Sequence, residues 1–180
     1  ASYLSLVDWK EQWLEGGRFP YTPSIAEVRG VEAVCDALLA EGHEAAIRRH
    51  TTASRACRAG VRAMGLAPWP RREEIMSTCV TAVRLPEGVT DVQLRRHAVE
   101  RYGVMLSGGQ GAGNLVRIGH MGETARSLHP VVGLVALGRS LADLGITVGL
   151  GAGVEAALEV LSAASDTSAA EAASAARPTA

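Results

Sequence analysis

The segment best suited to bind a ligand places an arginine directly after a run of glycines. Arg117 is expected on a short strand, and the glycine-rich loop 107–113 comes just before it. A guanidinium offers a planar pair of N–H donors that matches the two oxygens of a carboxylate. Glycines allow a ligand to approach the backbone closely. The pattern predicts a site for a small acid or a phosphate, with a purely structural arginine as the alternative.

Other residues capable of chemistry are better explained by packing. Gly149–Gly153 opens a helix with the pattern G-x-G-x-G, but no second strand with a ribose-binding acid follows, as a dinucleotide site requires. His120 could touch a ligand, although a packed histidine at a strand end is the favoured interpretation. No serine or cysteine nucleophile has a supporting histidine motif. Three cysteines lack the paired spacing of a zinc site and are expected to be buried free thiols: Cys35, Cys57 and Cys79.

Charge and hydropathy exclude several classes of function. The formal net charge of −1 provides no general attraction for nucleic acid or anionic lipid. The longest apolar run, 131–137, is too short to cross a bilayer, and no signal peptide opens the sequence. We therefore expect a soluble, cytoplasmic protein. One predicted helix is basic along a side that suits an outer face, through Arg48, Arg49, Arg55, Arg58 and Arg62.

The elements that position these residues follow from periodicity and from helix-start and helix-stop signals. Helices are expected at 2–14, 23–42, 43–64, 90–102, 124–144 and 154–161, and strands at 78–85, 104–106 and 115–118. Thr22 is predicted to cap the second helix, with Pro23 at its first position. Gly65 is expected to end the third helix, and Thr90 to begin the fourth.

This order of elements predicts an α+β fold in which helices cover a small sheet. Aromatic residues are scarce at 4%, so small residues should form the contacts between layers. We expect an arm and connector over 1–24, one domain over 25–161 and a disordered tail over 162–180, which is rich in Ala and Ser.

Several stretches, in this order, resemble the class V aminotransferases, which are fold-type I enzymes dependent on pyridoxal 5′-phosphate (PLP). The resemblance extends from about residue 1 to residue 161 and includes the alanine–glyoxylate, serine–pyruvate and pyridoxamine–pyruvate aminotransferases. Together the pieces are specific: Ser2-Tyr-Leu-Ser-Leu, Tyr21-Thr-Pro-Ser, Thr78-Cys-Val-Thr-Ala-Val, Ser107-Gly-Gly-Gln-Gly and Leu115-Val-Arg-Ile-Gly-His-Met-Gly. The resemblance implies the small C-terminal domain of such an enzyme, preceded by a helical arm.

The resemblance also implies roles for particular residues. Arg117 matches the arginine that binds the substrate carboxylate, and Gly109 and Gln110 lie in the loop beside it. Gln110 stands where the pyridoxamine–pyruvate type carries a second arginine, which favours small amino acids and 2-oxo acids as substrates. Thr22 matches a threonine that reaches the PLP phosphate of the neighbouring subunit. Some members of the family place a phosphate-binding tyrosine at the position of Phe19, so Tyr21 is the candidate replacement.

What the family requires and this sequence lacks is the Schiff-base lysine, which the resemblance places before residue 1. The aspartate that pairs with the pyridine nitrogen and the aromatic that stacks on the ring are absent with it. PLP chemistry depends on that attachment and on an electron sink. Lys10 is the only lysine in the sequence, and it lies in the amphipathic arm without a phosphate-binding context. This chain alone is not expected to transaminate.

Three hypotheses fit these observations. The favoured one is a small subunit whose large, PLP-binding partner carries the lysine, in a hetero-oligomer built on an aminotransferase dimer. Ala1 is compatible with a natural start after methionine removal, and the polar tail with a natural C-terminus. A fragment of an ordinary aminotransferase explains the same residues, and a non-catalytic module that binds small carboxylates is the rival from another class. The apolar residues of the arm, Leu4, Leu6, Trp9 and Trp13, predict an interface.

Overall fold

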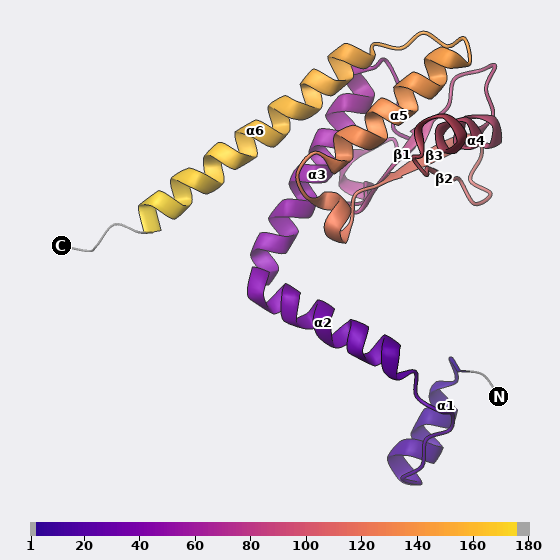
Figure 1. The fold of residues 1–180 in the computed structure, drawn as a ribbon, viewed down its shortest axis with the longest axis vertical. Helices are drawn as coiled ribbons and strands as arrows, with labels where there is room; N and C mark the ends of the chain where they lie inside the picture. The colour runs from indigo at the N-terminus through magenta and orange to yellow at the C-terminus, as the bar shows by residue number, and fades with distance from the viewer. Residues whose placement is uncertain (1–2, 176–180) are drawn as a thin grey trace. The chain divides into compact units, whose positions relative to one another are not determined.

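The computed structural model describes residues 3–175, with side chains described as far as residue 165, and it divides into two compact units (Figure 1). Unit 1 comprises Ala1–His43 and unit 2 comprises Glu44–Ala180. This division falls about one helix later than the boundary expected at residue 24. Within the described residues, no helix is both long and apolar enough to cross a membrane.

Unit 1 consists of a folded arm and one long helix. The arm contains the short helix α1 (Leu6–Asp8), which continues as the π-helix η1 (Trp9–Glu15), and α2 covers Ile25–Glu41. The arm is held by aromatic contacts, because Trp13 and Phe19 stack with their ring centroids 4.0 Å apart. None of the residues in these three helices is buried.

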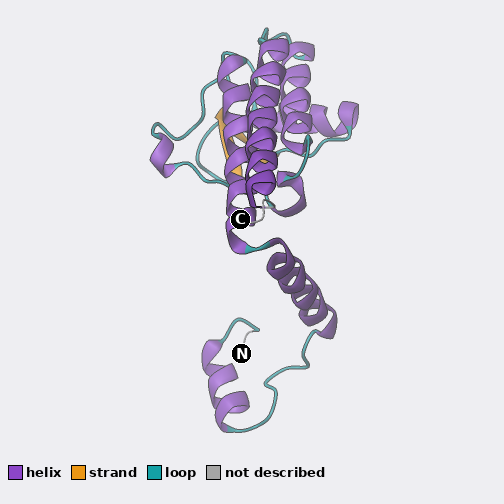
Figure 2. Cartoon of the chain, turned by 90° about the vertical axis from the view of Figure 1, so that its left-hand side faces the viewer, coloured by secondary structure: helices purple, strands orange, loops and turns teal. Residues whose placement is uncertain are grey.

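Unit 2 contains the remaining elements: α3 (His43–Ala63, whose first residue belongs to unit 1), η2 (Glu73–Ile75), β1 (Val80–Arg84), α4 (Asp91–Tyr102), β2 (Ser107–Gly108), β3 (Leu115–Gly119), η3 (Gly122–Ala125), α5 (His129–Asp143) and α6 (Leu150–Ala175). The three strands form an antiparallel sheet in the order β1-β3-β2. Figure 2 shows the helices of unit 2 packed in front of this sheet. The structure is therefore an α+β domain, as the sequence predicts.

The two faces of the sheet differ. In the register of β1 and β3, Val83 pairs with Val116 and both side chains are fully buried, so this face looks into the core. Ala82 pairs with Arg117, and both are only partly buried. Because side chains alternate along a strand, Arg117 lies on the face opposite to the core. The core side is filled mainly from the helices, by residues that include Leu94, Val61, Leu134, Leu137 and Leu141.

Small residues allow the helices of unit 2 to approach closely. A Cβ atom added to Gly60 on α3 would lie 2.9 Å from the carbonyl oxygen of Gly153 on α6, and the reverse substitution meets the same limit. Added to Gly133 on α5, it would lie 2.6 Å from a methyl carbon of Ile118 on β3. Gly153 is thus a helix-packing residue.

Helix ends show where the sequence signals were sufficient. Thr90 caps α4 as predicted, in a capping box with Gln93, and Gly65 follows α3 with a φ of 81°. The predicted cap at Thr22 is wrong: α2 begins at Ile25, after Ser24. Ser24 takes the extended backbone conformation of a helix-capping residue without making a side-chain cap.

The C-terminal half departs from expectation in three places. The predicted strand at 104–106 begins three residues later, at Ser107, and covers only Ser107–Gly108. The single helix predicted over 124–144 is split into η3 and α5, because Ser127 adopts a φ of 49°, which interrupts helical geometry. Helix α6 extends through residue 175, into the segment expected to be disordered, as its alanine content favours. Residues 176–180 of that expected tail lie outside the described residues.

The expectation of buried thiols holds for one cysteine out of three. Cys57 is buried in the core, Cys79 is partly buried, and Cys35 on α2 is exposed. Burial raises the pKa of the Cys57 thiol to about 11, despite a hydrogen bond with Thr81 that opposes this shift. Cys57 is therefore a protonated packing residue at neutral pH.

Candidate functional site

Arg117 lies at the centre of a β-hairpin that fixes one side of its guanidinium. Its Nε donates a hydrogen bond to the carbonyl oxygen of Gly108 at 2.7 Å, across the pairing of β2 with β3. Arg117 makes no other hydrogen bond or ion pair with any residue that the structure describes. The two terminal nitrogens therefore remain available as a fork, with an orientation set by the bond at Nε.

The loop between β2 and β3 carries the other two predicted substrate residues. A Cβ atom at Gly109 would lie 2.8 Å from the carbonyl oxygen of Gly113 and 2.9 Å from the Leu115 side chain, so the loop itself requires a glycine there. Gln110 is exposed and has a φ of 51°, an uncommon conformation for a residue with a side chain. The structure thus brings Gly109, Gln110 and Arg117 together in one hairpin.

The two predicted cofactor residues lie in unit 1 and differ in their surroundings. The hydroxyl of Tyr21 donates to the Asp8 carboxylate at 3.0 Å, and its ring stacks on Tyr3. The hydroxyl of Thr22 makes no hydrogen bond with another described residue, while its backbone carbonyl accepts one from Tyr3 at 3.1 Å. A hydroxyl that already serves a carboxylate is poorly suited to a phosphate, whereas the exposed Thr22 hydroxyl is free to donate.

The arm also explains Phe19 and Lys10. Phe19 packs between Trp13 and Trp9, so its ring holds the arm together. Lys10 lies exposed on η1, with its Nζ 3.7 Å from a carboxylate oxygen of Glu15. An exposed, ion-paired ammonium differs from the desolvated lysine that forms Schiff bases in PLP enzymes.

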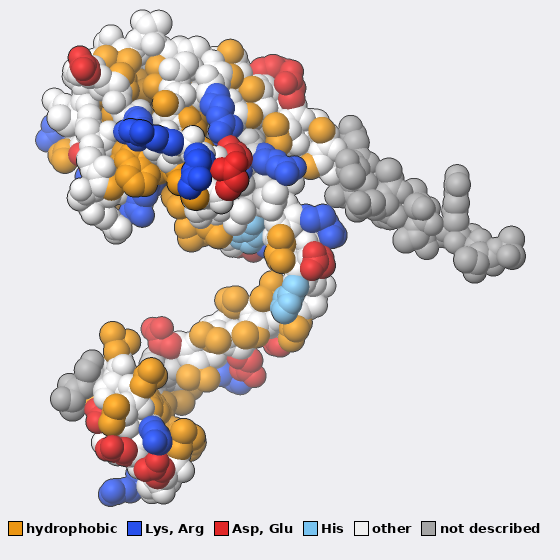
Figure 3. Space-filling model, turned by 180° about the vertical axis from the view of Figure 1, so that it is seen from behind, with side chains coloured by type: hydrophobic (Ala, Val, Ile, Leu, Met, Phe, Trp, Pro, Cys, Tyr) orange, Lys and Arg blue, Asp and Glu red, His pale blue; other side chains and the backbone are white. Residues whose placement is uncertain are grey.

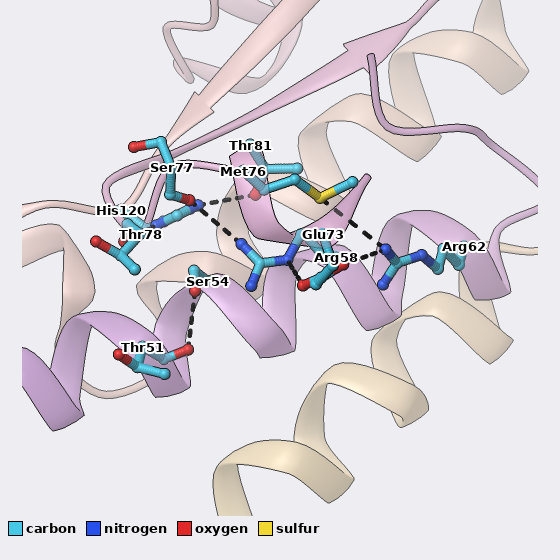
Figure 4. A network of polar contacts seen from close by, with 10 residues as sticks. All are labelled: Thr51, Ser54, Arg58, Arg62, Glu73, Met76, Ser77, Thr78, Thr81 and His120. Atoms are coloured by element: carbon cyan, nitrogen blue, oxygen red, sulfur yellow. Dashed lines mark hydrogen bonds and ion pairs between the residues drawn. The ribbon is translucent and has the colours of Figure 1, made fainter. Parts of the chain in front are cut away.

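A polar network that the sequence did not reveal involves residues of α3, of β1 and of the end of β3 (Figure 4). Arg58 points inward from α3, and its side chain is only 7% exposed. Its Nε lies 2.7 Å from a carboxylate oxygen of Glu73, and its Nη1 donates to the Ser77 carbonyl at 3.2 Å. The expectation that Arg58 belongs to an outer basic face is therefore wrong. The signal available was its spacing, since it follows Ser54 by one helical turn and precedes Val61 by another.

His120 belongs to the same network and has a packing role. The Nδ1–H donates to the carbonyl oxygen of Thr78 at 3.1 Å, which leaves Nε2 to accept from the Thr81 hydroxyl at 2.8 Å. The side chain is fully buried, and burial lowers the pKa of the imidazole below its usual value. His120 is therefore neutral at pH 7 and anchors the end of β3.

Arg117 does not line either of two concavities in unit 2. The larger, about 1020 Å³, lies among α3, the turn before α5, and α6, and its lining includes four arginines and no acidic side chain. Those arginines are Arg48, Arg49, Arg55 and Arg126. The smaller is bordered by Arg58, Trp69 and Met76. Arg117 thus lies outside both of these concavities.

The most apolar surface lies on unit 1. Figure 3 shows hydrophobic side chains along α2 and around the arm. Large apolar residues are exposed here, including Leu4 at 89% and Leu39 at 71%. Along α2 they recur with helical spacing at Ile25, Val28, Val31, Val34, Leu38 and Leu39. Contiguous exposed apolar surface of this kind marks an interface.

Comparisons with known proteins identify relatives of this chain. No family model matches the chain. It is 46% identical over 165 residues to a pyridoxamine–pyruvate transaminase of Mesorhizobium japonicum, a match that covers 91% of this chain and 42% of that protein. It is 36% identical over 160 residues to an L-aspartate–glyoxylate aminotransferase of Paracoccus denitrificans, covering 88% of this chain and 40% of the relative.

Solved structures match the same region. The crystal structure of a pyridoxamine-pyruvate aminotransferase from Mesorhizobium loti superposes with a TM-score of 0.81 at 44% identity, over 90% of this chain and 42% of that one. Fold and sequence therefore define an aminotransferase small domain. Its sequence and fold are consistent with a C-terminal part of a class V aminotransferase. It spans about two fifths of the length of the curated relatives that it matches.

Proposed function

We propose that this chain supplies the substrate-carboxylate arginine of an aminotransferase that moves an amino group between a small amino acid and a 2-oxo acid. The acceptor would be of the glyoxylate or pyruvate type. The observation that carries the proposal is the fork of Arg117, held at Nε by the Gly108 carbonyl and otherwise unpaired among the described residues. Bidentate binding would orient the carboxylate end of the substrate and leave the amino or oxo carbon at a fixed distance from it.

The residues of this chain suit only the phosphate group of PLP. Thr22 offers an exposed, unpaired hydroxyl that suits the phosphate, and we propose that Tyr21 supports it through Asp8 rather than binding the phosphate. When bound, PLP would supply the electron sink on which amino-group transfer depends. The lysine that anchors PLP would come from a large subunit or from an N-terminal region, because Lys10 is exposed and paired with Glu15.

The exposed apolar surface of unit 1 supports the existence of such a partner. Leucines and valines along α2 and in the arm need a cover that this chain does not provide. In the proposed assembly the lysine-bearing portion covers them and closes the open face around Arg117. A non-catalytic carboxylate-binding module would instead bind small acids without that portion.

A second donor is favoured by one observation. The relative with 46% identity is named as a pyridoxamine–pyruvate transaminase. Pyridoxamine is therefore the alternative amino donor. Against it, Gln110 stands where the family resemblance implies a second arginine in that type. Both candidates share a small 2-oxo acid as acceptor, which is the substrate whose carboxylate Arg117 would hold.

Replacement of Arg117 tests the proposal. In the assembled enzyme, Arg117→Ala should lower kcat/KM for a carboxylate substrate, because the carboxylate is left without its partner. The loss of transition-state stabilisation should be about 3–5 kcal/mol. Arg117→Lys keeps the charge but loses the fork, so it should cost less than Ala and still reduce efficiency. Steady-state kinetics with pyruvate or glyoxylate provides the measurement.

Two controls separate binding from structure. An amine substrate without a carboxylate should react slowly and be nearly indifferent to Arg117→Ala. Arg84→Ala removes an arginine of the neighbouring strand, whose Nη2 donates to the Trp69 carbonyl at 2.9 Å, and should leave kcat/KM unchanged. Equal losses with both kinds of substrate would show that Arg117 is structural.

Thr22 provides an independent test of the cofactor contact. Thr22→Val keeps the shape but removes the hydroxyl, and should weaken PLP retention by about 1–3 kcal/mol. The measurement is equilibrium dialysis of PLP against the assembled protein. Thr22→Ser is the matched control and should retain PLP. If Thr22→Val binds PLP as the wild type does, the hydroxyl has no role at the phosphate.

A further inference from the structure

We propose that an ion pair at the start of α4, between Asp91 and Arg95, positions Arg117 by fixing the Gly108 carbonyl. This inference rests on the proposed function, because it concerns the edge of the Arg117 guanidinium that meets the substrate carboxylate. Asp91 and Arg95 do not touch the substrate in this arrangement. They are positioning residues.

The first contact is the bond at Nε. A guanidinium can bind a carboxylate along the edge that contains Nε or along the edge formed by its two terminal nitrogens. In Arg117 the Nε–H is already donated to Gly108 at 2.7 Å. The remaining edge carries Nη1 and Nη2, so a carboxylate must bind end-on, in line with the side chain. The Gly108 carbonyl thereby selects the binding geometry.

The second contact fixes that carbonyl. Strand β2 has only two residues, and its pairing of Gly108 with Val116 gives it little support of its own. The α-carbon of Gly108 packs against the ion pair: a Cβ atom there would lie 2.9 Å from Oδ2 of Asp91 and 3.2 Å from the guanidinium carbon of Arg95. The lack of a side chain at Gly108 is therefore what allows α4 to brace β2.

The third contact fixes the ion pair. Asp91 and Arg95 lie one helical turn apart on α4. Oδ2 of Asp91 accepts hydrogen bonds from Nη2 of Arg95 at 2.9 Å and from its Nε at 3.2 Å. The backbone N–H of Asp91 donates to the side chain of Asn114 at 2.9 Å, and Asn114 in turn donates to the Val89 carbonyl at 2.8 Å. The start of α4 is thus tied to the loop that leads into β3.

The pair also keeps Arg95 away from the substrate. An unpaired arginine packed against Gly108 would be a second cation beside the fork and would compete for the same carboxylate. With both Nε and Nη2 directed to Asp91, Arg95 presents its charge to an acid of its own helix. Asp91 therefore serves geometry and charge at once.

The experiment follows the Nε–H of Arg117 by NMR in the full chain, with Arg95→Ala against the matched control Arg96→Ala. Arg96 is the exposed neighbour on α4 and has no partner among the described residues. Arg95→Ala should raise the solvent-exchange rate of the Arg117 Nε–H about tenfold, as expected for weakening one hydrogen bond, and Arg96→Ala should not. Arg95→Lys, which keeps a charge for Asp91, should restore part of the protection.

Glyoxylate added to the same samples separates this proposal from the proposed function. In the wild type it should shift the terminal nitrogens of Arg117 and leave Nε in place, and Arg95→Ala should weaken glyoxylate binding. If Arg95→Ala and Arg96→Ala give equal exchange rates, the positioning role is overturned. If Arg95→Ala loosens Nε but glyoxylate shifts nothing in the wild type, the positioning stands and the carboxylate role of Arg117 fails.

Discussion

Units 1 and 2 have similar proportions of apolar residues on their helices but use them in opposite ways. In unit 2, residues such as Leu94, Leu134 and Leu141 are fully buried around one core. In unit 1, none of the residues in α1, η1 or α2 is buried, and the stabilising contacts within the arm are aromatic stacks. Unit 2 therefore has a core of its own, whereas the described apolar residues of unit 1 form no buried core within that unit.

Charge divides along the same boundary. Unit 1 carries seven acidic residues against three basic ones, whereas unit 2 carries twelve acidic and fifteen basic. The basic excess of unit 2 includes the four arginines that line the larger concavity beside α3. The two units thus present surfaces of different chemistry, and a partner that covers unit 1 must be apolar where it meets α2.

The largest expected effect compares a leucine from each unit. Leu134→Ala, in the core of unit 2, should lower the free energy of unfolding by about 3 kcal/mol, through lost burial and a residual cavity. Leu39→Ala on α2 removes the same atoms from a side chain that is 71% exposed. It should change the free energy of unfolding by less than about 0.5 kcal/mol. Guanidinium denaturation of the full chain measures both. A large loss from Leu39→Ala would show that α2 is packed in the isolated chain.

Two helical glycines should respond to alanine with opposite signs. Gly60→Ala introduces a Cβ that would lie 2.4 Å from a methyl carbon of Leu134 and 2.9 Å from the Gly153 carbonyl, and should destabilise unit 2 by about 2 kcal/mol. A Cβ atom added at Gly30 on α2 would have no other atom within 4 Å. Gly30→Ala should therefore raise the helix content and stabilise α2 by about 1 kcal/mol. Thermal melts followed by circular dichroism distinguish the two. Equal behaviour would remove the contrast between the units.

The smallest effect is a pH dependence confined to unit 2. Burial lowers the pKa of His120 below the usual value of 6.5. The unfolded chain therefore takes up a proton below pH 6.5 that the folded state does not, so this histidine makes stability fall as pH drops below 6.5 and leaves it constant above. His120→Gln should flatten that dependence, and His129→Gln, at an exposed position, should retain it. Urea midpoints between pH 5 and 8 provide the test.

Local signals in the sequence predicted what local chemistry decides. The capping residue Thr90 and the strand that carries Arg117 formed as expected, because a hydroxyl before a helix and alternating apolar residues act over a few positions. Thr22-Pro23 carried the same kind of signal but did not start the helix. Instead Tyr3 bonds the Thr22 carbonyl, and this contact spans nineteen positions.

The contacts around the site could not be predicted from the sequence, because they join residues distant in the chain. The burial of Arg58 depends on Glu73 and Ser77 returning over α3, and a basic helix gives no sign of that. The bracing of Gly108 by the Asp91–Arg95 pair depends on a turn of α4 meeting a strand of two residues. Arg117 could be proposed from the sequence because an arginine next to a glycine-rich loop suits an anion.

The open position of Arg117 has a consequence for affinity. Opposite charges 4 Å apart attract by about 1 kcal/mol in water and by roughly 4 kcal/mol where the effective dielectric constant is 20, as near a protein surface. With water on its open face, the fork should hold glyoxylate only weakly, so that a shift of its terminal nitrogens requires a large excess of glyoxylate. A covering surface would raise the attraction without moving any atom of the arginine. Substrate capture at low concentrations of the 2-oxo acid would then depend on that covering surface.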